Sequence, residues 1–416
     1  MSKTSTRRQL STGYKQTNIG PLPNTWEAVL LGDLFVFKNG LNKAKRFFGS
    51  GIPIVNYMDV FERPGFKSGD LSGRVSLTPE EIRNFKVQKG DVFFTRTSET
   101  VEDIGVAAVM LDKPHDTVFS GFVLRARPRD GRLNDSYKQY CFSHGVVRSQ
   151  IISNATYTTR ALTNGRILST IWIAVPPIPE QRAIAEALSD VDGLLNALEV
   201  LIAKKQAIKQ ATMQQLLTGK TRLPGFSGEW ETKQLGQIAN CLDNVRVPLN
   251  EEQRASMPGP YPYCGANGVL DYVNDFVLDD DVILIAEDGG HFDEYAYRPI
   301  AYRMKGKIWV NNHAHILKAK PGYSQAFLFF SLVHKNILPY LVGGTRAKLN
   351  KFEMNKIEVQ LPLNTAEQEA IASILSDIDA EITALEQRRD KTHAIKHGMM
   401  QQLLTGRVRL VKSGAE

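Results

Sequence analysis

The sequence predicts a mixed α/β (α+β) protein with pseudo-twofold symmetry, in which two unlike globular segments are joined by two long antiparallel helices. The main observation is an internal duplication. Residues 180–223 align without a gap on residues 367–410, and 25 of the 44 aligned positions are identical. Both copies end in Met-Gln-Gln-Leu-Leu-Thr-Gly, and a longer segment of different sequence precedes each of them. The long segment between the copies lets the chain return, which favours an antiparallel pair of helices.

Helix start and stop signals divide the chain. Pro176, Pro177 and Pro179 end a strand and delay the first helix until about Glu180, because proline restricts the backbone around it. The second helix begins after a possible Thr365 cap with Gln at the capping-box spacing, and both helices end at a Thr-Gly pair. We therefore expect a flexible N-terminal tail over 1–20, a first globular segment over 21–178, a first helix over 179–220, a second globular segment over 221–363, a second helix over 364–408 and a C-terminal tail over 409–416.

Apolar residues recur in both helices at heptad spacing and predict a broad stripe for a partner helix. In the first copy this stripe includes Leu194, Leu201 and Ile208 at one heptad position. The second copy has Glu381 and Arg388 at two of the equivalent positions, so its middle is less apolar. Two separate bundle helices are the alternative. The residues expected to pair the helices or to bind a partner are Ile184, Leu188, Val191, Leu195, Leu198, Ile371, Leu375, Ile378, Ile382 and Leu385.

The two globular segments also correspond to each other, although weakly. The clearest match is a Thr-Arg-Ala triplet followed three residues later by Asn, at 159–164 and again at 345–350. Trp26 corresponds to Trp230, and an Asp-Val pair before an apolar strand occurs at 91–92 and 281–282. Each segment is therefore expected to be a copy of one fold that mixes short strands with helices.

Composition favours a protein of the reducing cytoplasm that binds a polyanion. The net charge is +7 and the isoelectric point is near 9.1, although a generic basic surface explains that excess equally well. The three cysteines, Cys141, Cys241 and Cys264, are scattered and odd in number, which argues against a disulfide framework and a cysteine-rich zinc site. Neither a signal peptide nor an apolar run long enough to span a bilayer is present.

Motifs for chemistry are missing. Gly219-Lys220-Thr221 resembles the end of a phosphate-binding loop but lacks the earlier glycine, so it is interpreted as a helix stop. No adenine-methylation motif, no glycine fingerprint for S-adenosylmethionine and no nuclease carboxylate cluster was found. His313 and His315 alternate on an expected strand without a third ligand nearby, which favours a nucleic-acid or structural role over a metal site. We expect neither a catalytic site nor a metal site.

With this pattern of segments, the chain resembles the specificity subunit of type I restriction–modification enzymes. The most specific motifs are Pro-Pro-Ile-Pro-Glu-Gln at 176–181, Ala-Glu-Gln at 366–368, and the two Met-Gln-Gln-Leu-Leu-Thr-Gly endings. The resemblance implies that the globular segments are two target recognition domains, which read the two halves of a bipartite DNA sequence across the helices. It implies a non-catalytic chain that binds no cofactor and partners two methyltransferase subunits, which carry S-adenosylmethionine and methylate adenine. Restriction subunits that translocate and cut DNA can join them.

The residues agree with this reading, because two dissimilar heads on a spacer of fixed length would read an asymmetric target with a fixed gap. Two other hypotheses are a methylation-only system and a coiled-coil adaptor that joins two proteins. Base reading needs Arg, Lys, Asn or Gln in loops at strand ends, with hydroxyl groups for phosphates. The candidates in the first segment are Lys43, Lys45, Arg46, Arg96, Thr97, Ser98, Thr158, Thr159, Arg160 and Asn164, and those in the second are Asn267, His291, Asn311, Asn312, His313, Thr345, Arg346 and Lys348.

Overall fold

The computed structural model describes residues 12–157, 159–344 and 347–410. It divides into two compact units, one formed by residues 1–197 with 388–416 and the other by residues 198–387. Each unit holds one globular head together with part of each long helix. Head 1 covers Tyr14–Val175 and head 2 covers Trp230–Pro362. Among the described residues, no helix is both long and apolar enough to cross a membrane.

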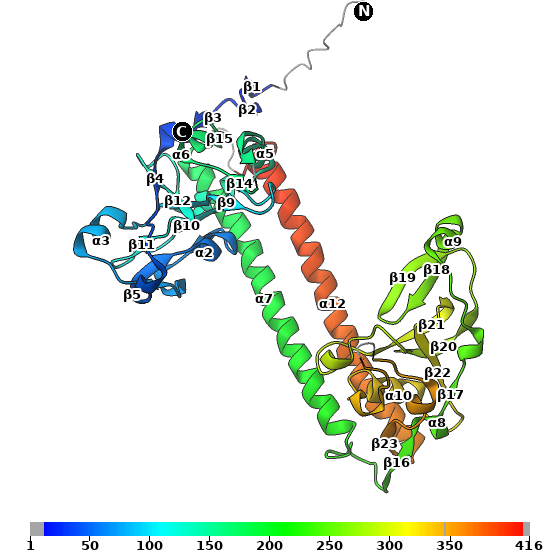
Figure 1. The fold of residues 1–416 in the computed structure, drawn as a ribbon. Coiled ribbons are helices and arrows are strands. Elements are labelled where there is room, and N and C mark those ends of the chain that lie inside the picture. Colours follow the sequence, from blue (N-terminus) through cyan, green and yellow to red (C-terminus); the bar gives the residue numbers. More distant parts are fainter. Residues whose placement is uncertain (1–11, 158, 345–346, 411–416) are drawn as a thin grey trace, which may run out of the picture. The chain divides into compact units, whose positions relative to one another are not determined.

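The two long helices are α7 (Ile178–Leu216) and α12 (Thr365–Leu403), and they run antiparallel (Figure 1). In the first unit, Lys396 Nζ lies 2.6 Å from an Asp192 carboxylate oxygen. In the second unit, Lys209 Nζ lies 2.6 Å from Asp379. Both pairs join a residue early in one helix to a residue late in the other, which defines the antiparallel direction. The two pairs are also equivalent under the 187-residue repeat of the sequence, so the expected pseudo-twofold symmetry is confirmed in the contacts.

The buried side of the helices is narrower than the apolar stripe of the sequence. Leu194, Leu201 and Ile208 are 38–41% exposed, although the heptad pattern placed them in the stripe. A single partner helix covers one seam only, so part of a broad stripe stays open. Of the residues predicted to pair the helices, Ile184, Leu188, Leu195, Leu198, Ile371, Leu375 and Ile382 are buried, and Val191, Ile378 and Leu385 are partly exposed.

A Glu-Gln pair at the start of each helix anchors the helix in its unit. Glu180 is fully buried and accepts hydrogen bonds from Arg409 and from Trp26 Nε1, the latter at 2.8 Å. Glu367 is fully buried as well and accepts two bonds of 2.6 Å from Arg222. Arg222 and Arg409 occupy equivalent positions of the repeat. In each unit, the segment that follows one long helix therefore bonds to the first turn of the other long helix.

The glutamines beside these glutamates bond to the backbone of their heads. Gln181 accepts a bond from Asn134 N and donates to Pro176 O, and Gln368 likewise bonds Ser324 N and Pro362 O. Helix α7 begins at Ile178, two residues earlier than predicted, because a proline in the first turn has no helical N–H bond to lose.

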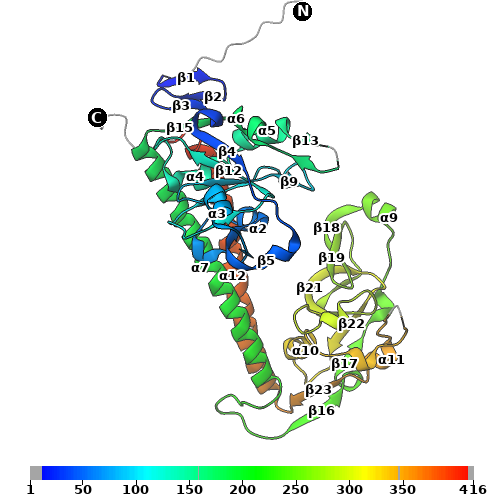
Figure 2. The ribbon, with the colours of Figure 1, turned by 60° about the vertical axis from the view of Figure 1, so that its left-hand side comes forward.

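Head 1 is built on a five-stranded sheet of order β4-β12-β8-β10-β6, seen side-on with its helices in Figure 2. Its strands are β1 (Tyr14–Thr17), β2 (Gly20–Pro23), β3 (Glu27–Leu30), β4 (Phe35–Asn39), β5 (Phe48–Val55), β6 (Gly65–Phe66), β7 (Arg74–Val75), β8 (Val92–Thr95), β9 (Thr97–Ser98), β10 (Ala107–Met110), β11 (Val118–Phe119), β12 (Val123–Pro128), β13 (Thr156–Tyr157), β14 (Ala161–Leu162) and β15 (Trp172–Val175). Its helices are α1 (Leu31–Leu34), α2 (Tyr57–Phe61), α3 (Pro79–Phe85), α4 (Asp135–Cys141), α5 (Gly145–Asn154) and α6 (Gly165–Ser169).

Head 2 is built on a six-stranded sheet of order β17-β22-β20-β21-β18-β19. Its strands are β16 (Trp230–Gln234), β17 (Ala239–Cys241), β18 (Pro258–Gly265), β19 (Gly268–Val273), β20 (Leu278–Ala286), β21 (Ala301–Val310), β22 (Ala314–Ala319) and β23 (Glu358–Pro362). Its helices are α8 (Leu235–Ile238), α9 (Glu251–Ser256), α10 (Gln325–Leu332) and α11 (Lys351–Met354). Figures 1 and 2 show α9 with β18 and β19 at one end of the head and β16 with β23 at the other.

The central strands of the two heads are equivalent, which confirms that the heads share one fold. Strand β8 follows Asp91 and pairs with β12, with Phe94 opposite Leu124. Strand β20 contains Asp281 and pairs with β22, with Leu284 opposite Ile316. The strand ends match in their hydrogen bonds, because Arg96 N donates to Phe122 O in head 1 and Glu287 N donates to His313 O in head 2. Both central strands are buried on both faces, which explains why they read as continuous apolar runs.

The region predicted as a flexible tail over 1–20 is in part ordered. Residues 14–23 form the β1–β2 hairpin, and Tyr14 Oη donates a 2.7 Å hydrogen bond to Gly406 O. The hairpin therefore packs on the segment after α12, a long-range contact that the polar composition of the tail does not indicate.

Candidate nucleic-acid interface

Most candidates of head 1 lie around the end of its central strand. Beyond Thr95, the backbone N–H of Arg96 donates to Phe122 O at 3.2 Å, and Arg96 O accepts from Thr163 N. The following strand, β9, pairs with β14, which pairs with β13. The fold thus brings Thr97 and Ser98 opposite Leu162 and Ala161 of β14, although some 60 residues separate the two strands in the sequence.

The basic loop of head 1 reaches the same edge. Gly121 N donates to Leu41 O at 2.8 Å, which holds the loop against the turn before β12. Lys45 and Arg46 are exposed, whereas Lys43 forms a 2.6 Å ion pair with Glu81. Lys45 and Arg46 are therefore better placed than Lys43 to meet a phosphate.

In the Thr-Arg-Ala triplet and the Asn that follows it three residues later, the Asn has a structural role. Asn164 accepts a bond from Ile167 N and caps α6, and Asn350 caps α11 in the same way through Glu353 N. Asn164 Oδ1 thus serves as a helix cap, and the role of this residue in base reading stays a prediction. Thr159 and Arg160 are exposed, with an Arg160 guanidinium nitrogen 3.7 Å from Glu99. Thr158, Thr345 and Arg346 lie outside the described residues.

Head 2 gathers charged and amide groups at the equivalent strand end. His313 Nδ1 lies 2.5 Å from an Asp288 oxygen, and Lys348 Nζ lies 2.8 Å from Glu287. The Glu287 carboxylate raises the pKa of Lys348 above its usual range. Burial would raise the pKa of Glu287, but Lys348 and Arg246 bring it below the ordinary value. Lys348 therefore carries its charge at this edge and is 46% exposed.

The remaining candidates of head 2 differ in their freedom to bind. Asn311 is buried and accepts from His313 N, so it shapes the turn, whereas Asn312 is exposed. Asn267 donates to Gly289 O at 2.9 Å, and His291 Nε2 lies 2.6 Å from an Arg298 nitrogen. A hollow beside the turn is lined by Asn250, Gln253, Arg254, Tyr263, Leu270 and Asn311–His313, among others.

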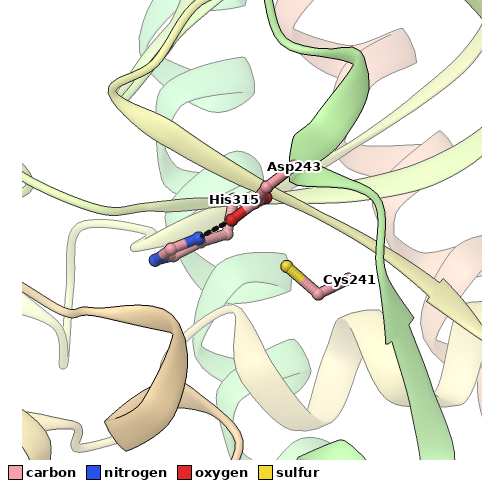
Figure 3. A group of neighbouring side chains, drawn as sticks. All are labelled: Cys241, Asp243 and His315. Atoms are coloured by element: carbon pink, nitrogen blue, oxygen red, sulfur yellow. Dashed lines mark hydrogen bonds and ion pairs between the residues drawn. The ribbon is translucent and has the colours of Figure 1, made fainter.

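His313 and His315 have separate roles. His315 is buried, and its Nδ1 lies 2.6 Å from Asp243 (Figure 3). Its Nε2 lies 2.7 Å from Leu349 O. This contact ties β22 to the segment that carries Lys348. The link from His315 to Asp243 crosses 72 residues and could not be read from the sequence.

The Asp243–His315 pair also has Cys241 beside it, and the three donor atoms lie within 4.8 Å of one another, a spacing that permits a shared cation. Both ring nitrogens of His315 already have oxygen partners, however, and an Arg246 nitrogen lies 3.3 Å from Asp243. Burial and the neighbouring carboxylate raise the pKa of Cys241 to about 12, so the thiol keeps its proton in this environment. We interpret the cluster as a structural ion network.

Sequence reasoning missed the exposed apolar residues of the head 1 edge. Phe122 is 65% exposed and Tyr157 is 57% exposed. It also missed Glu287 and Asp288, because acidic side chains do not by themselves indicate contact with DNA. The position of Asp288 two residues beyond a central strand, equivalent to that of Thr97, was the available signal.

Comparisons with known proteins agree with this geometry. The model of the family described as "Type I restriction modification DNA specificity domain" matches residues 23–210 and again residues 227–393. A type I restriction enzyme specificity subunit of Haemophilus influenzae is 35% identical over 159 residues, which span 38% of this chain and 39% of the relative. The MjaX specificity subunit of Methanocaldococcus jannaschii is 26% identical over 428 aligned residues, covering 95% of this chain and 97% of the relative.

Among solved structures, the S subunit of a type I restriction–modification system from M. genitalium has the same fold, with a TM-score of 0.60 and 18% identity. That alignment covers 94% of this chain and 97% of the other. Both matched regions contain a head followed by most of its long helix, and together they account for most of the chain. The chain is therefore a member of the type I restriction–modification DNA specificity family.

Proposed function

We propose that this chain is the DNA sequence-recognition subunit of a type I restriction–modification complex. It reads an asymmetric two-part target with a fixed gap and directs adenine-N6 methylation and restriction by partner subunits. The observation that carries the proposal is that two heads of one fold present different side chains at equivalent strand ends. Different groups at one position of the fold read different bases, while the symmetric helices keep the two readers in register.

The partners in this proposal are double-stranded DNA, two methyltransferase subunits and, in the restricting form, translocase subunits, all in the cytoplasm. The exposed apolar residues of α7, among them Val200, Leu201 and Ile208, support a docked protein on this helix. The equivalents of Leu194 and Leu201 in α12 are Glu381 and Arg388, so the two docking faces differ in chemistry. S-adenosylmethionine and all bond-making steps belong to the partner subunits, and this chain supplies recognition only.

Adenine methylation mapping by long-read sequencing tests the proposal. One host expresses the neighbouring methyltransferase with this chain, and the matched control expresses the same methyltransferase with an early stop codon in this chain. We expect a two-part asymmetric motif with a fixed gap in the first host only. The same motif in both hosts, or a continuous palindromic motif that depends on this chain, would contradict the proposal.

A transformation assay distinguishes a system that restricts DNA from one that only methylates it. An unmodified plasmid that carries the mapped motif should transform the expressing host with lower efficiency than a plasmid that lacks the motif. Equal transformation would assign the chain to a methylation-only system while leaving sequence recognition intact.

A further inference from the structure

We propose that Phe122 is an apolar wedge with which head 1 stacks on bases and partly unstacks its half of the target. This inference rests on the proposed DNA-recognition function and deepens it. Its basis is an exposed aromatic side chain that a rigid turn presents among groups suited to bind DNA.

The turn that carries Phe122 is held on several sides. Ser120 N donates to Val55 O, Gly121 N donates to Leu41 O, and Val123 N donates back to Ser120 O, with lengths of 2.8–3.1 Å. A Cβ at Gly121 would lie 2.1 Å from Asn42 Oδ1, so the basic loop packs closely on this turn. The backbone under Phe122 is therefore preorganised, and little conformational freedom remains to be lost when a ligand binds.

The fold itself gains little from the phenylalanine. Its side chain is 65% exposed, whereas neighbouring Val123 and Leu124 are fully buried. Within the described residues, the ring makes no close aromatic or cation contact, unlike Phe93 and Phe119 of the same sheet. An aromatic ring in water on a fixed turn is suited to meet another flat apolar surface.

The surroundings favour DNA over a purely apolar partner. Arg96 lies opposite Phe122 in the antiparallel register, and within the part of the chain that the structure describes its side chain has no hydrogen-bond or ionic partner. Lys45 and Arg46 are exposed on the loop beside the turn. Cations that hold phosphates around an apolar residue are the arrangement with which proteins insert side chains between base pairs.

The other head lacks this device. By the shared hydrogen-bond pattern, Arg96 and Phe122 of head 1 correspond to Glu287 and His313 of head 2. Arg96 N and Glu287 N donate to Phe122 O and His313 O, and Arg96 O and Glu287 O accept from Thr163 N and Leu349 N. Head 2 instead places its exposed His313 at this edge, next to Asp288. We therefore assign wedge-assisted reading to head 1 and hydrogen-bond reading to head 2.

The test uses the complex of the full chain with its methyltransferase and a duplex of the mapped target. Phe122→Ala should weaken binding of the intact target roughly 5- to 150-fold, the range of one lost base–aromatic stack. The dependence of affinity on salt should stay unchanged, because no phosphate contact is removed. Phe122→Tyr should bind within about threefold of the native complex, because tyrosine keeps the stacking ring. Phe61→Ala, which removes another exposed aromatic ring of head 1, is the matched control and should leave binding unchanged.

A second readout detects the unstacking itself. Duplexes with 2-aminopurine in either half-site should brighten on binding only in the half read by head 1, and Phe122→Ala should abolish that signal. Unchanged affinity and fluorescence for Phe122→Ala would overturn the inference. Loss of methyltransferase assembly in that variant would overturn it too, by showing that the ring binds a protein. If the native complex prefers no sequence at all, the proposed function fails first, and the two failures are thereby distinguished.

Discussion

Arg409→Ala should destabilise the first unit selectively, because it leaves a buried carboxylate without its ionic partner. Glu180 is fully buried, and after the substitution it keeps only the bond from Trp26 Nε1. Removing one partner of a buried ion pair costs about 3–5 kcal/mol. The Arg409 side chain is 24% exposed, so water reaches the vacated position in part, and we expect the lower end, about 3 kcal/mol. Glu180→Gln added to Arg409→Ala should recover part of this loss, because no buried charge then lacks a partner.

Hydrogen exchange followed by mass spectrometry of peptides measures this effect unit by unit, which a single unfolding midpoint of a two-unit protein does not. A loss of about 3 kcal/mol speeds exchange in the core of head 1 by roughly two orders of magnitude, with head 2 peptides unchanged. Arg407→Ala is the matched control, since Arg407 is an exposed arginine of the same segment. Equal effects of the two substitutions, or acceleration in both heads, would refute the assignment of Arg409 as the closing contact of the first unit.

Three further predictions concern other parts of the molecule. Burial raises the pKa of Cys241 to about 12 from its ordinary 9.0, so above pH 9 the unfolded chain loses a proton that the folded chain keeps. The stability of head 2 should therefore fall as the pH rises from 9 to 12, and Cys241→Ala should reduce the slope of that decline in a pH series of urea unfolding. Arg160→Ala should weaken duplex binding about threefold or less in a titration at matched salt, since Arg160 is exposed and already has Glu99 nearby. Leu201→Glu with Ile208→Glu should leave the chain folded, because both residues are about 40% exposed, but should weaken methyltransferase assembly in analytical ultracentrifugation; unchanged assembly would remove these residues from the docking face.

The long helices were predictable because their information is local and repeated. Two copies with the same endings, start signals and heptad spacing define each helix to within a few residues, and the structure places them at Ile178–Leu216 and Thr365–Leu403. The choice of buried seam was not predictable at Leu194, Leu201 and Ile208. Burial there depends on which side the partner helix covers, and an apolar stripe wider than one seam leaves that choice open.

The candidate interface was predicted in part for a similar reason. A loop that follows a strand can be recognised locally, and Arg96–Ser98 and Asn311–His313 do lie beside the ends of the central strands, while their contact with DNA stays a prediction. The roles of individual residues depend on contacts distant in sequence. The contact of His315 with Asp243 spans 72 residues and leaves no mark in the spacing of the residues. The capping bond of Asn164 to Ile167 N is local, so its signal was present in the sequence.

The symmetry of the chain is kept where residues contact each other and lost where they face outward. Glu180 and Glu367 each hold an arginine, and Asp192 and Asp379 each hold a lysine, with partners that are also repeat equivalents. Changing one member of such a pair leaves a charge without its partner, which opposes drift. Within the described part of the chain, the side chains of the edge residues Arg96 and Phe122 make no comparable contact, and their equivalents Glu287 and His313 differ from them in charge and shape. Contacts within each unit are therefore constrained in pairs, whereas the edge side chains are free to differ between the heads, which is the division of roles that the proposed function requires.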